Sequence, residues 1–222
     1  MSVDTKGVIA TPVKDVLAVS AIIEQALNRL IRRARLVAYP DRHVIDEAVL
    51  NEFKNVSTSL SYGASFVRMD FIYKGEHRNL NVHFDCDSDS KAIAKESLIL
   101  SLGLWGSSEL IMRTVLHALS VFGEAYIDVN DSDSVDIAKV EVPRLTLFQA
   151  LAHQYLSAYQ LERLVEKFQQ GKLGMEGSLE DFLGISEERF NELMAIADSQ
   201  LRWGAMESEA KACFEVIEVM PA

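Results

Sequence analysis

Near residue 55 the spacing of the apolar residues changes from a helical period to a strand period, and this change constrains the fold of the chain more than any other feature. Between residues 15 and 37 apolar side chains recur every three, four or seven positions, which predicts one long amphipathic helix. Asp15 can begin this helix, and the proline of Tyr39-Pro40 follows its end. A second helix is predicted over about residues 43–54.

Three segments between residues 57 and 85 alternate polar and apolar side chains, which predicts three strands. Two-residue turns at Gly63-Ala64 and Gly75-Glu76 would join these strands, because glycine at the first central position suits a type II′ hairpin. Both turns give an antiparallel meander in which one face is apolar. The predicted apolar pairs are Leu60–Val67, Thr58–Met69, Val67–Phe84, Met69–Val82 and Phe71–Leu80.

Residues 97–129 predict a strand, a helix and another strand. Leucines at alternate positions of 97–104 follow a strand period, although leucine itself favours helix, so a helix stays open as the alternative there. Ser107 or Ser108 can cap a helix that ends at Gly123, and residues 124–129 form the next strand. A strand–helix–strand unit is normally right-handed with parallel strands. Its two strands and the three of the meander give a predicted sheet of five strands.

The C-terminal part returns to helix. Helices are predicted near 145–158, 159–170, 178–183 and 186–201, and residues 212–219 form a short strand or simply fold back. The expected fold is therefore α+β, with a mostly antiparallel sheet made of the meander and the βαβ unit. The predicted parts are an N-terminal helical segment over 1–54, a central sheet domain over 55–143 and a C-terminal helical subdomain over 144–222.

Charge and cysteine content exclude several classes of protein. The 222 residues carry a net charge of −11, which disfavours general nucleic-acid binding, and residues 151–222 hold 13 acidic against 6 basic residues. Cys86 and Cys213 form neither a disulfide framework nor a zinc motif. The N-terminus does not resemble a signal peptide, and no apolar run of 18 residues occurs, so we expect a cytoplasmic protein without a membrane span.

The stretch HFDCDSDS, residues 83–90, suggests a calcium loop. Asp85, Asp87, Asp89 and Glu96 have the spacing of EF-hand positions 1, 3, 5 and 12. However, Ser90 replaces the glycine of position 6, a strand precedes the loop, and two lysines lie within it. The alternative is that aspartate and serine form Asx-type turns where a strand ends.

A second acidic turn follows the last predicted strand of the sheet. The predicted topology places it at the opposite edge from Asp85–Asp89 but close to the helix start at Gly106, Ser107 and Ser108, which could bind an anion. Carboxylates there could hold Mg²⁺ against a phosphate, although the glycine spacing matches no P-loop or dinucleotide motif and a plain helix cap is the alternative. The residues of this turn with candidate ligand oxygens are Asp128, Asn130, Asp131 and Asp133.

The histidines share no catalytic motif. The predicted register places Arg68 opposite His83 and Asp70 opposite Asn81, which indicates a solvated polar face of the sheet. His117 lies in an otherwise apolar helix and is interpreted as a core histidine.

The segment LEDFLGISEERFNELM, residues 179–194, resembles a helix-turn-helix motif. Its second helix is acidic, and only Arg189 is positive, so it would repel the phosphates that dominate DNA affinity. A compact helical corner is therefore expected. The basic residues gather elsewhere and either bind an acidic partner, a phosphate or RNA, or form a solvated face: they are Arg29, Arg32, Arg33, Arg35 and Arg42.

The sequence thus favours a non-enzymatic cytoplasmic binding or regulatory protein that works through an acidic surface. The alternatives are a divalent-metal-dependent phosphoester or nucleotide enzyme using the Asp128–Asp133 turn, and a calcium-stabilised module. No organic cofactor is expected, and Mg²⁺ or Ca²⁺ would be the metal. A protein partner is expected, and a homodimer could form through the helix over 15–37. The candidate partner-binding residues are Arg29, Arg32, Arg33, Glu187, Glu188 and Glu192.

Overall fold

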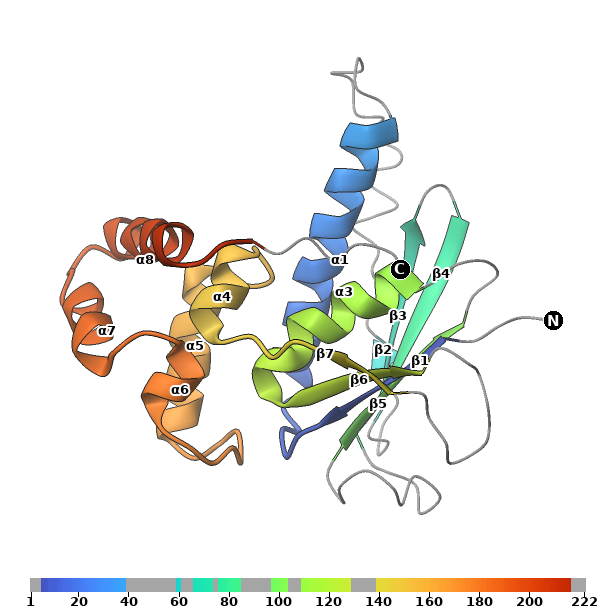
Figure 1. The fold of residues 1–222 in the computed structure, drawn as a ribbon, viewed down its shortest axis with the longest axis horizontal. Coiled ribbons are helices and arrows are strands. Elements are labelled where there is room, and N and C mark those ends of the chain that lie inside the picture. The colour runs from blue at the N-terminus through green and yellow to red at the C-terminus, as the bar shows by residue number, and fades with distance from the viewer. Residues whose placement is uncertain are drawn as a thin grey trace.

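The fold is α+β, as the sequence predicts (Figure 1). The computed structural model describes residues 5–38, 59–60, 66–73, 76–84, 97–103, 109–128 and 139–216. The strands are β1 (Thr5–Ala10), β2 (Ser59–Leu60), β3 (Phe66–Tyr73), β4 (Glu76–His83), β5 (Ser97–Gly103), β6 (Glu124–Asp128) and β7 (Lys139–Val142). The helices are α1 (Val16–Ala38), α3 (Glu109–Leu119), the short 3-10 helix η1 (Ser120–Phe122), α4 (Leu147–Ala152), α5 (Ala158–Gln169), α6 (Leu179–Leu183), α7 (Glu187–Met194) and α8 (Ser199–Cys213).

The strands form one seven-stranded sheet in the order β2-β3-β4-β5-β1-β6-β7, and every neighbouring pair is antiparallel. The predicted strand–helix–strand unit is present as β5, α3 and β6, whose two strands point the same way. They are not neighbours, however, because β1 lies between them and pairs with both. The prediction of five strands is therefore wrong, because the sheet also contains β1 and β7, which the sequence pattern did not reveal.

The register of the meander agrees with the prediction at one hairpin and differs at the other. Leu60 pairs with Val67, as predicted. In the β3–β4 hairpin Tyr73 pairs with Glu76, so only Lys74 and Gly75 lie between the strands, not the predicted Gly75-Glu76 turn. This shifts the partners by two residues and leaves each side chain on its predicted face. The predicted pairs of this hairpin, including Arg68–His83 and Asp70–Asn81, are therefore wrong. The observed pairs are Val67–Val82, Met69–Leu80, Arg68–Asn81, Asp70–Asn79 and Phe66–His83.

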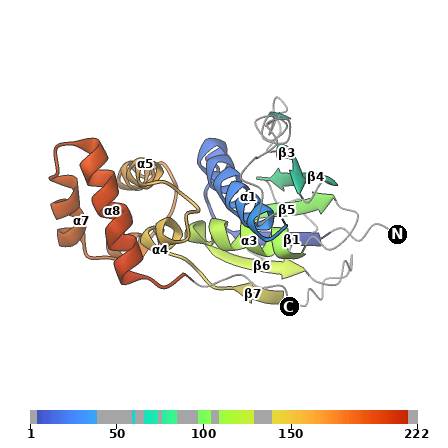
Figure 2. The same ribbon diagram turned by 90° about the horizontal axis from the view of Figure 1, so that it is seen from above.

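Helices α1 and α3 cover the apolar face of the sheet. α3 packs on β1 and β6, and α1 packs on α3 and β3 (Figures 1 and 2). Gly7 of β1 allows the close approach of α3, because a Cβ atom there would lie 2.8 Å from Cδ1 of Leu116. Among the described strand residues, those buried on this face are Gly7, Ile9, Met69, Leu80, Val82, Ala125, Ile127 and Val142.

The C-terminal helices extend to one side of the sheet, and α7 and α8 lie farthest from the strands (Figures 1 and 2). Serine, threonine or aspartate caps the start of each of them: Thr146, Ser157, Ser178, Ser186 and Asp198 accept backbone hydrogen bonds at the first turns of α4 to α8. Thr146 and Ser157 form capping boxes with Gln149 and Gln160.

The structure corrects the predicted helix over 186–201, which is two helices, because α7 ends at Met194 and the Asp198 side chain starts a new helix by accepting from the Leu201 amide. That new helix, α8, runs to Cys213, so residues 212 and 213 are helical, whereas the sequence left a short strand or a fold-back open over 212–219. Residues 217–219 lie outside the described residues. Leu201 is 69% exposed while Met206 is fully buried, so apolar residues lie on more than one side of α8 and give no clear helical stripe.

Gly184, at the end of α6, packs closely against Thr146 at the start of α4. Its φ of 82° is left-handed, which favours glycine. A Cβ atom there would also lie 2.2 Å from Oγ1 of Thr146, the residue that caps α4. The predicted turn between the two helices of the motif is therefore held against a neighbouring helix.

Two predictions cannot be compared with the structure. The predicted helix over 43–54 lies outside the described residues. The division into 1–54, 55–143 and 144–222 also remains a prediction, and β1 comes from the first of these segments. Within the described ranges, no helix combines the length and the apolar composition needed to cross a membrane.

Candidate functional site

An exposed group of carboxylates lies where α6 and α7 begin. We call it the acidic corner, and it consists of Glu180, Asp181, Glu187 and Glu188. The backbone amide of Glu187 donates to Oε1 of Glu180 over 3.1 Å, so the first turns of the two helices are in contact. Carboxylates are favoured at helix N-termini because the helix dipole is positive there. Local helix physics therefore gathers these charges at one place.

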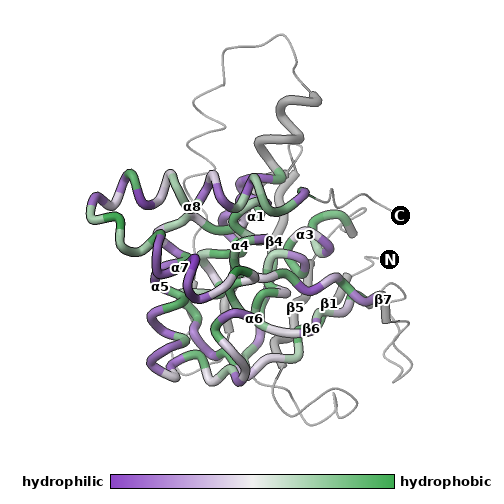
Figure 3. Tube along the Cα trace, turned by 60° about the vertical axis from the view of Figure 1, so that its left-hand side comes forward, coloured by the Kyte–Doolittle hydropathy of each residue, from purple (hydrophilic) through white to green (hydrophobic). Residues whose placement is uncertain are grey.

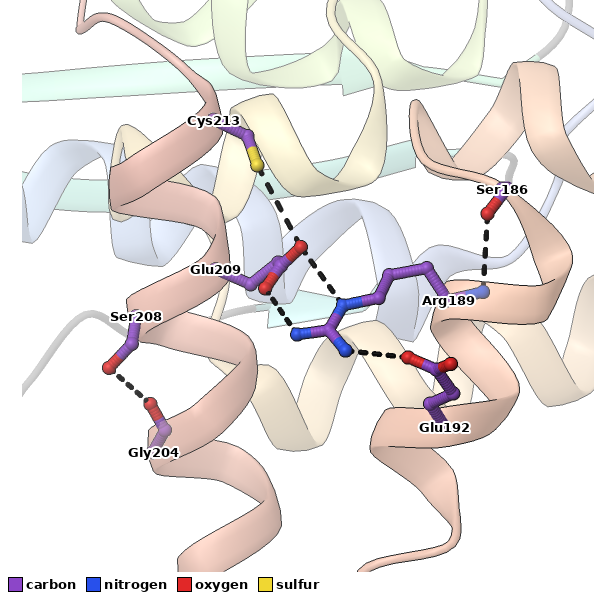
Figure 4. A network of polar contacts seen from close by, with 7 residues as sticks. All are labelled: Ser186, Arg189, Glu192, Gly204, Ser208, Glu209 and Cys213. Carbon is purple, nitrogen blue, oxygen red and sulfur yellow. Dashed lines mark hydrogen bonds and ion pairs between the residues drawn. The ribbon is translucent and has the colours of Figure 1, made fainter.

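Arg189, the basic residue of the predicted second motif helix, is exposed but forms ion pairs with glutamates of the same chain (Figure 4). Its Nε and Nη2 atoms donate to the two carboxylate oxygens of Glu209 on α8 over 3.1 and 2.8 Å, and Nη1 donates to Glu192 over 2.6 Å. These contacts raise the pKa of Arg189, and the Arg189 hydrogen bond lowers the pKa of Glu209. A fork of two parallel bonds fixes geometry well, so Arg189 and Glu209 brace α7 against α8.

Other basic residues of these helices are also engaged in ion pairs. Arg202 of α8 donates to Glu162 of α5 over 2.6 Å and to the carbonyl of Ile196 over 2.7 Å. Arg163 pairs with Glu166 within α5, and Lys167 pairs with Asp15 at the start of α1. In the part of the chain that the structure describes, the acidic corner has no ion pair with a basic side chain. The corner therefore carries a negative charge that no described ion pair compensates. Hydrophilic and apolar stretches alternate along α5, α7 and α8 (Figure 3).

A second cluster lies where the C-terminal helices meet α1 and α3. His117 of α3, His153 at the end of α4 and Tyr155 just after it are 3%, 2% and 0% exposed. The two imidazole rings are 4.9 Å apart between centroids, and the rings of His153 and Tyr155 stack at 5.3 Å. The Tyr155 hydroxyl lies 3.2 Å from Nδ1 of His117. Arg29 of α1 places its guanidinium carbon 5.2 Å from the centroid of the Tyr155 ring.

The charge state of His117 follows from this environment. Burial lowers its pKa, and the neighbouring His153 and Arg29 lower it further, to about 4. His117 is thus a neutral, hydrogen-bonded core histidine at neutral pH, which agrees with the interpretation from sequence. A buried neutral ring of this kind organises packing, and its closed surroundings offer no support for a role as a catalytic base at an open site.

Most candidate metal ligands lie outside the described residues. These are Asp85, Asp87, Asp89, Glu96, Asn130, Asp131 and Asp133, together with the anion-binding candidates Gly106, Ser107 and Ser108. Asp128 is described and ends β6. Within the described ranges, no group of three or more histidine, cysteine, aspartate or glutamate residues could hold a metal ion.

The strand directions agree with the topological part of the metal prediction. β4 runs opposite to β5 and β6, so the ends of β4 and β6, which precede the two acidic stretches, point to opposite edges of the sheet. The ends of β5 and β6 point to the same edge. Lys6 of β1 lies between them, because it pairs with Ser101 on one side and with Asp128 on the other. The sequence did not reveal this basic position, since β1 was not predicted.

Of the candidate basic residues Arg29, Arg32, Arg33, Arg35 and Arg42, only Arg29 has a described side chain. Arg29 is half-buried against Tyr155, whereas the side chains of Arg32 and Arg33 lie outside the described part of the chain. Dimerisation through residues 15–37 remains a prediction. α1 buries Val19, Ile22, Ile23, Ala26 and Leu27 in the core and leaves Leu17 73% exposed.

Comparisons of the chain with protein-family models, with curated proteins and with solved structures found no match.

Proposed function

We propose that this chain is a non-enzymatic, cytoplasmic binding or regulatory protein that captures a basic protein partner through the acidic corner. The observation that carries the proposal is the distribution of charge in the C-terminal helices. Four of the six lysine and arginine side chains in this part of the chain, Arg163, Lys167, Arg189 and Arg202, are held in ion pairs, while Glu180, Asp181, Glu187 and Glu188 are exposed. A cluster of like charges attracts partners of opposite charge and raises their association rate.

The same charges argue against DNA as the partner of the α6–α7 corner. A recognition helix must approach phosphates, and phosphate contacts from lysine and arginine supply much of the affinity. Here the first turn of α7 carries Glu187 and Glu188, and Arg189 is occupied by Glu192 and Glu209. The α6–α7 corner resembles a helix-turn-helix, but its charges suit a cationic protein surface and not DNA.

The proposal is tested by the association kinetics of a defined probe, a synthetic helical peptide rich in lysine and arginine. Glu187→Gln combined with Glu188→Gln removes two charges from the acidic corner. Glu207→Gln combined with Glu215→Gln removes two exposed charges elsewhere and is the matched control. We expect the corner variant to slow association several-fold at low ionic strength, and the control variant to slow it much less, because the local field at the corner guides the encounter.

Circular dichroism confirms that both variants stay helical before they are compared. Equal slowing in the two variants would mean that only net charge matters, and the acidic corner would then lose its special role. A probe that binds wild type and both variants at the same rate would reject the proposal altogether.

The second candidate is a divalent-metal-dependent phosphoester or nucleotide enzyme. It is supported by the common edge at which β5 and β6 end, since the Asp128–Asp133 turn follows one strand and residues 106–108 follow the other. Thermal unfolding of wild type, Asp131→Asn and Asp87→Asn with EDTA, Mg²⁺ or Ca²⁺ tests it. A micromolar site at millimolar metal would stabilise the fold by roughly 4 kcal/mol. An unchanged midpoint of the wild type in both metals would remove this candidate and the calcium loop together.

A further inference from the structure

The C-terminal helices share one hydrophobic core with α1 and α3, and several specific polar and aromatic contacts add to it. The buried amide of Leu145 donates to Oγ of Ser120 over 3.0 Å, which ties the segment before α4 to the end of α3. Lys167 of α5 pairs with Asp15 at the start of α1. The ring cluster of His117, His153 and Tyr155 fills the interior of this junction. We call these contacts the joint.

The ring cluster places ionisable groups of one sign close together in the interior. The charges that act on His117 come from His153 at the end of α4 and from Arg29 on α1, and both residues are basic. Tyr155 supplies a phenol hydroxyl to His117 and an aromatic face to Arg29. Beneath α3, the buried residues of β1 and β6 are apolar: they are Gly7, Ile9, Ala125 and Ile127. A proton added to His117 would therefore create a buried positive charge that His153 and Arg29 both disfavour.

We propose that the His117–His153–Tyr155–Arg29 cluster is an acid-sensitive joint, which holds the C-terminal helices against α1 and α3 when His117 is neutral and releases them when His117 takes up a proton. The device is separate from the acidic corner and does not depend on what that corner binds. It acts on the placement of the whole helical subdomain that carries the corner.

The direction of the effect follows from proton linkage. In the closed joint the pKa of His117 is about 4, whereas an exposed histidine has a pKa near ~6.5. The open form thus binds more protons between these two pH values, and opening becomes about tenfold more favourable for each unit that the pH falls within this window. Over the whole window the population of the open form rises by roughly 300-fold. Above the window His117 is neutral in both forms and the equilibrium does not change.

The ion pair at the joint responds only at lower pH. Burial raises the pKa of Asp15, but hydrogen bonds from Lys167 and from the Ala18 amide outweigh it and hold the pKa below its usual value. Asp15 therefore stays ionised while His117 begins to favour opening. The first loosening on acidification belongs to the ring cluster.

Hydrogen exchange of single amides, followed by NMR and corrected for the intrinsic effect of pH, measures the opening directly. The Leu145 amide is a reporter of the joint, because its hydrogen bond to Ser120 spans the junction. The amides of β1, which is paired on both sides within the sheet, report on global unfolding. We expect protection at Leu145 to fall about tenfold per pH unit below pH ~6.5. Global unfolding also exposes His117, so protection of the β1 amides falls with a similar slope, but it should stay higher than protection at Leu145 at every pH.

Three variants make the test specific. His117→Gln keeps a neutral polar side chain and should remove most of the pH dependence at Leu145. His83→Gln changes an exposed histidine on β4 and should leave that dependence as it is in wild type. Arg29→Gln offers a second test that spares the buried rings: without the guanidinium the pKa of His117 in the closed joint rises, so the total loss of protection becomes smaller.

Each contrary result overturns the proposal. Unchanged pH dependence in His117→Gln would show that the ring is not the sensor. Equal protection at Leu145 and in β1 at every pH would show that Leu145 exchanges only when the whole chain unfolds and that no joint opens first. An undiminished effect in Arg29→Gln would show that the cluster does not act as a charged group.

Discussion

The Nδ1 atom of His117 and the hydroxyl oxygen of Tyr155 lie 3.2 Å apart, although 38 residues separate them in the sequence. Because its pKa of about 4 keeps His117 neutral at pH 7, one ring nitrogen is free of a proton and Nδ1 can accept a hydrogen bond from the phenol. This bond connects α3, which packs on the sheet, to the end of α4, which begins the C-terminal helices. This buried polar contact thus joins α3 to the C-terminal helices, as the buried bond from the Leu145 amide to Ser120 also does.

Removal of that hydroxyl should destabilise the protein measurably. Tyr155→Phe keeps the stacked ring but leaves the His117 nitrogen without its phenol donor, so the free energy of unfolding should fall by about 1–2 kcal/mol. Urea denaturation at pH 7 measures the change. Tyr159→Phe is the control, because that residue is half-exposed, and its loss should stay within ~0.5 kcal/mol. Equal effects of the two substitutions would show that the buried hydrogen bond adds no net stability.

Asp15 has two roles that substitution can separate. Its Oδ1 atom accepts the Ala18 amide over 3.0 Å at the start of α1, and its Oδ2 atom pairs with Lys167. Asparagine caps helices as well as aspartate does but carries no charge, so Asp15→Asn should cost well under ~1 kcal/mol, as partly exposed ion pairs usually do. Asp15→Ala also removes the cap and should cost about 1 kcal/mol more.

Denaturation of both Asp15 variants at neutral and acidic pH completes this test. The folded-state pKa of Asp15 lies below its usual value, so its stabilising contribution is present at neutral pH and is lost as the pH falls through that low value. Both variants should lack this acid-dependent loss. If Asp15→Asn destabilised as strongly as Asp15→Ala, the ion pair to α5 would be the dominant contact.

Gly184 should tolerate no side chain, for two physical reasons that a control can separate. Alanine there would adopt a φ of 82° and would place its Cβ 2.2 Å from Oγ1 of Thr146. Gly171 has a similar φ of 66°, but a Cβ atom added to it would meet no other atom within 4 Å. Thermal unfolding should show a loss of about 1 kcal/mol for Gly171→Ala and at least twice that for Gly184→Ala. Equal losses would mean that Thr146 moves aside freely and that its cap of α4 contributes little.

Periodic segments with clear caps could be predicted from the sequence. The helix over 15–37, the helix that ends at Gly123 and the strand over 97–104 all correspond to observed elements, because each has a long apolar pattern or a recognisable boundary. The α+β class follows from these elements alone. The acidic corner was predicted only in part: Glu187 and Glu188 were candidates, Glu180 and Asp181 were not, and the third candidate of this segment, Glu192, pairs with Arg189.

Features that depend on tertiary contacts could not be predicted. β1 is short and contains Gly7, a poor strand former, and its place between β5 and β6 is set by pairing on both edges. The β3–β4 register depends on whether the turn begins at Lys74 or Gly75, and both choices keep the same buried face. The cluster of His117, His153, Tyr155 and Arg29 brings together three distant segments that share no motif.

The turn between His153 and Tyr155 offers a stabilising substitution close to the joint. Gln154 has a φ of 60°, which is uncommon for a residue other than glycine. The amide of Gln154 donates to the Leu151 carbonyl and that of Tyr155 to the Ala150 carbonyl, both over 2.9 Å, which is the Schellman pattern that ends many helices. Glycine is preferred at this position because a left-handed conformation costs it nothing in steric terms.

Gln154→Gly should therefore raise the free energy of unfolding by about 0.5–1 kcal/mol, which chemical denaturation can resolve. The gain is limited because glycine loses more backbone entropy on folding than glutamine does. Gln170→Gly is the matched control: that residue is also an exposed glutamine after a helix, but its φ is −82°, so glycine there brings only the entropic loss and should lower stability. Opposite signs for the two substitutions would locate strain at Gln154, whereas destabilisation by both would show that its left-handed conformation is not strained.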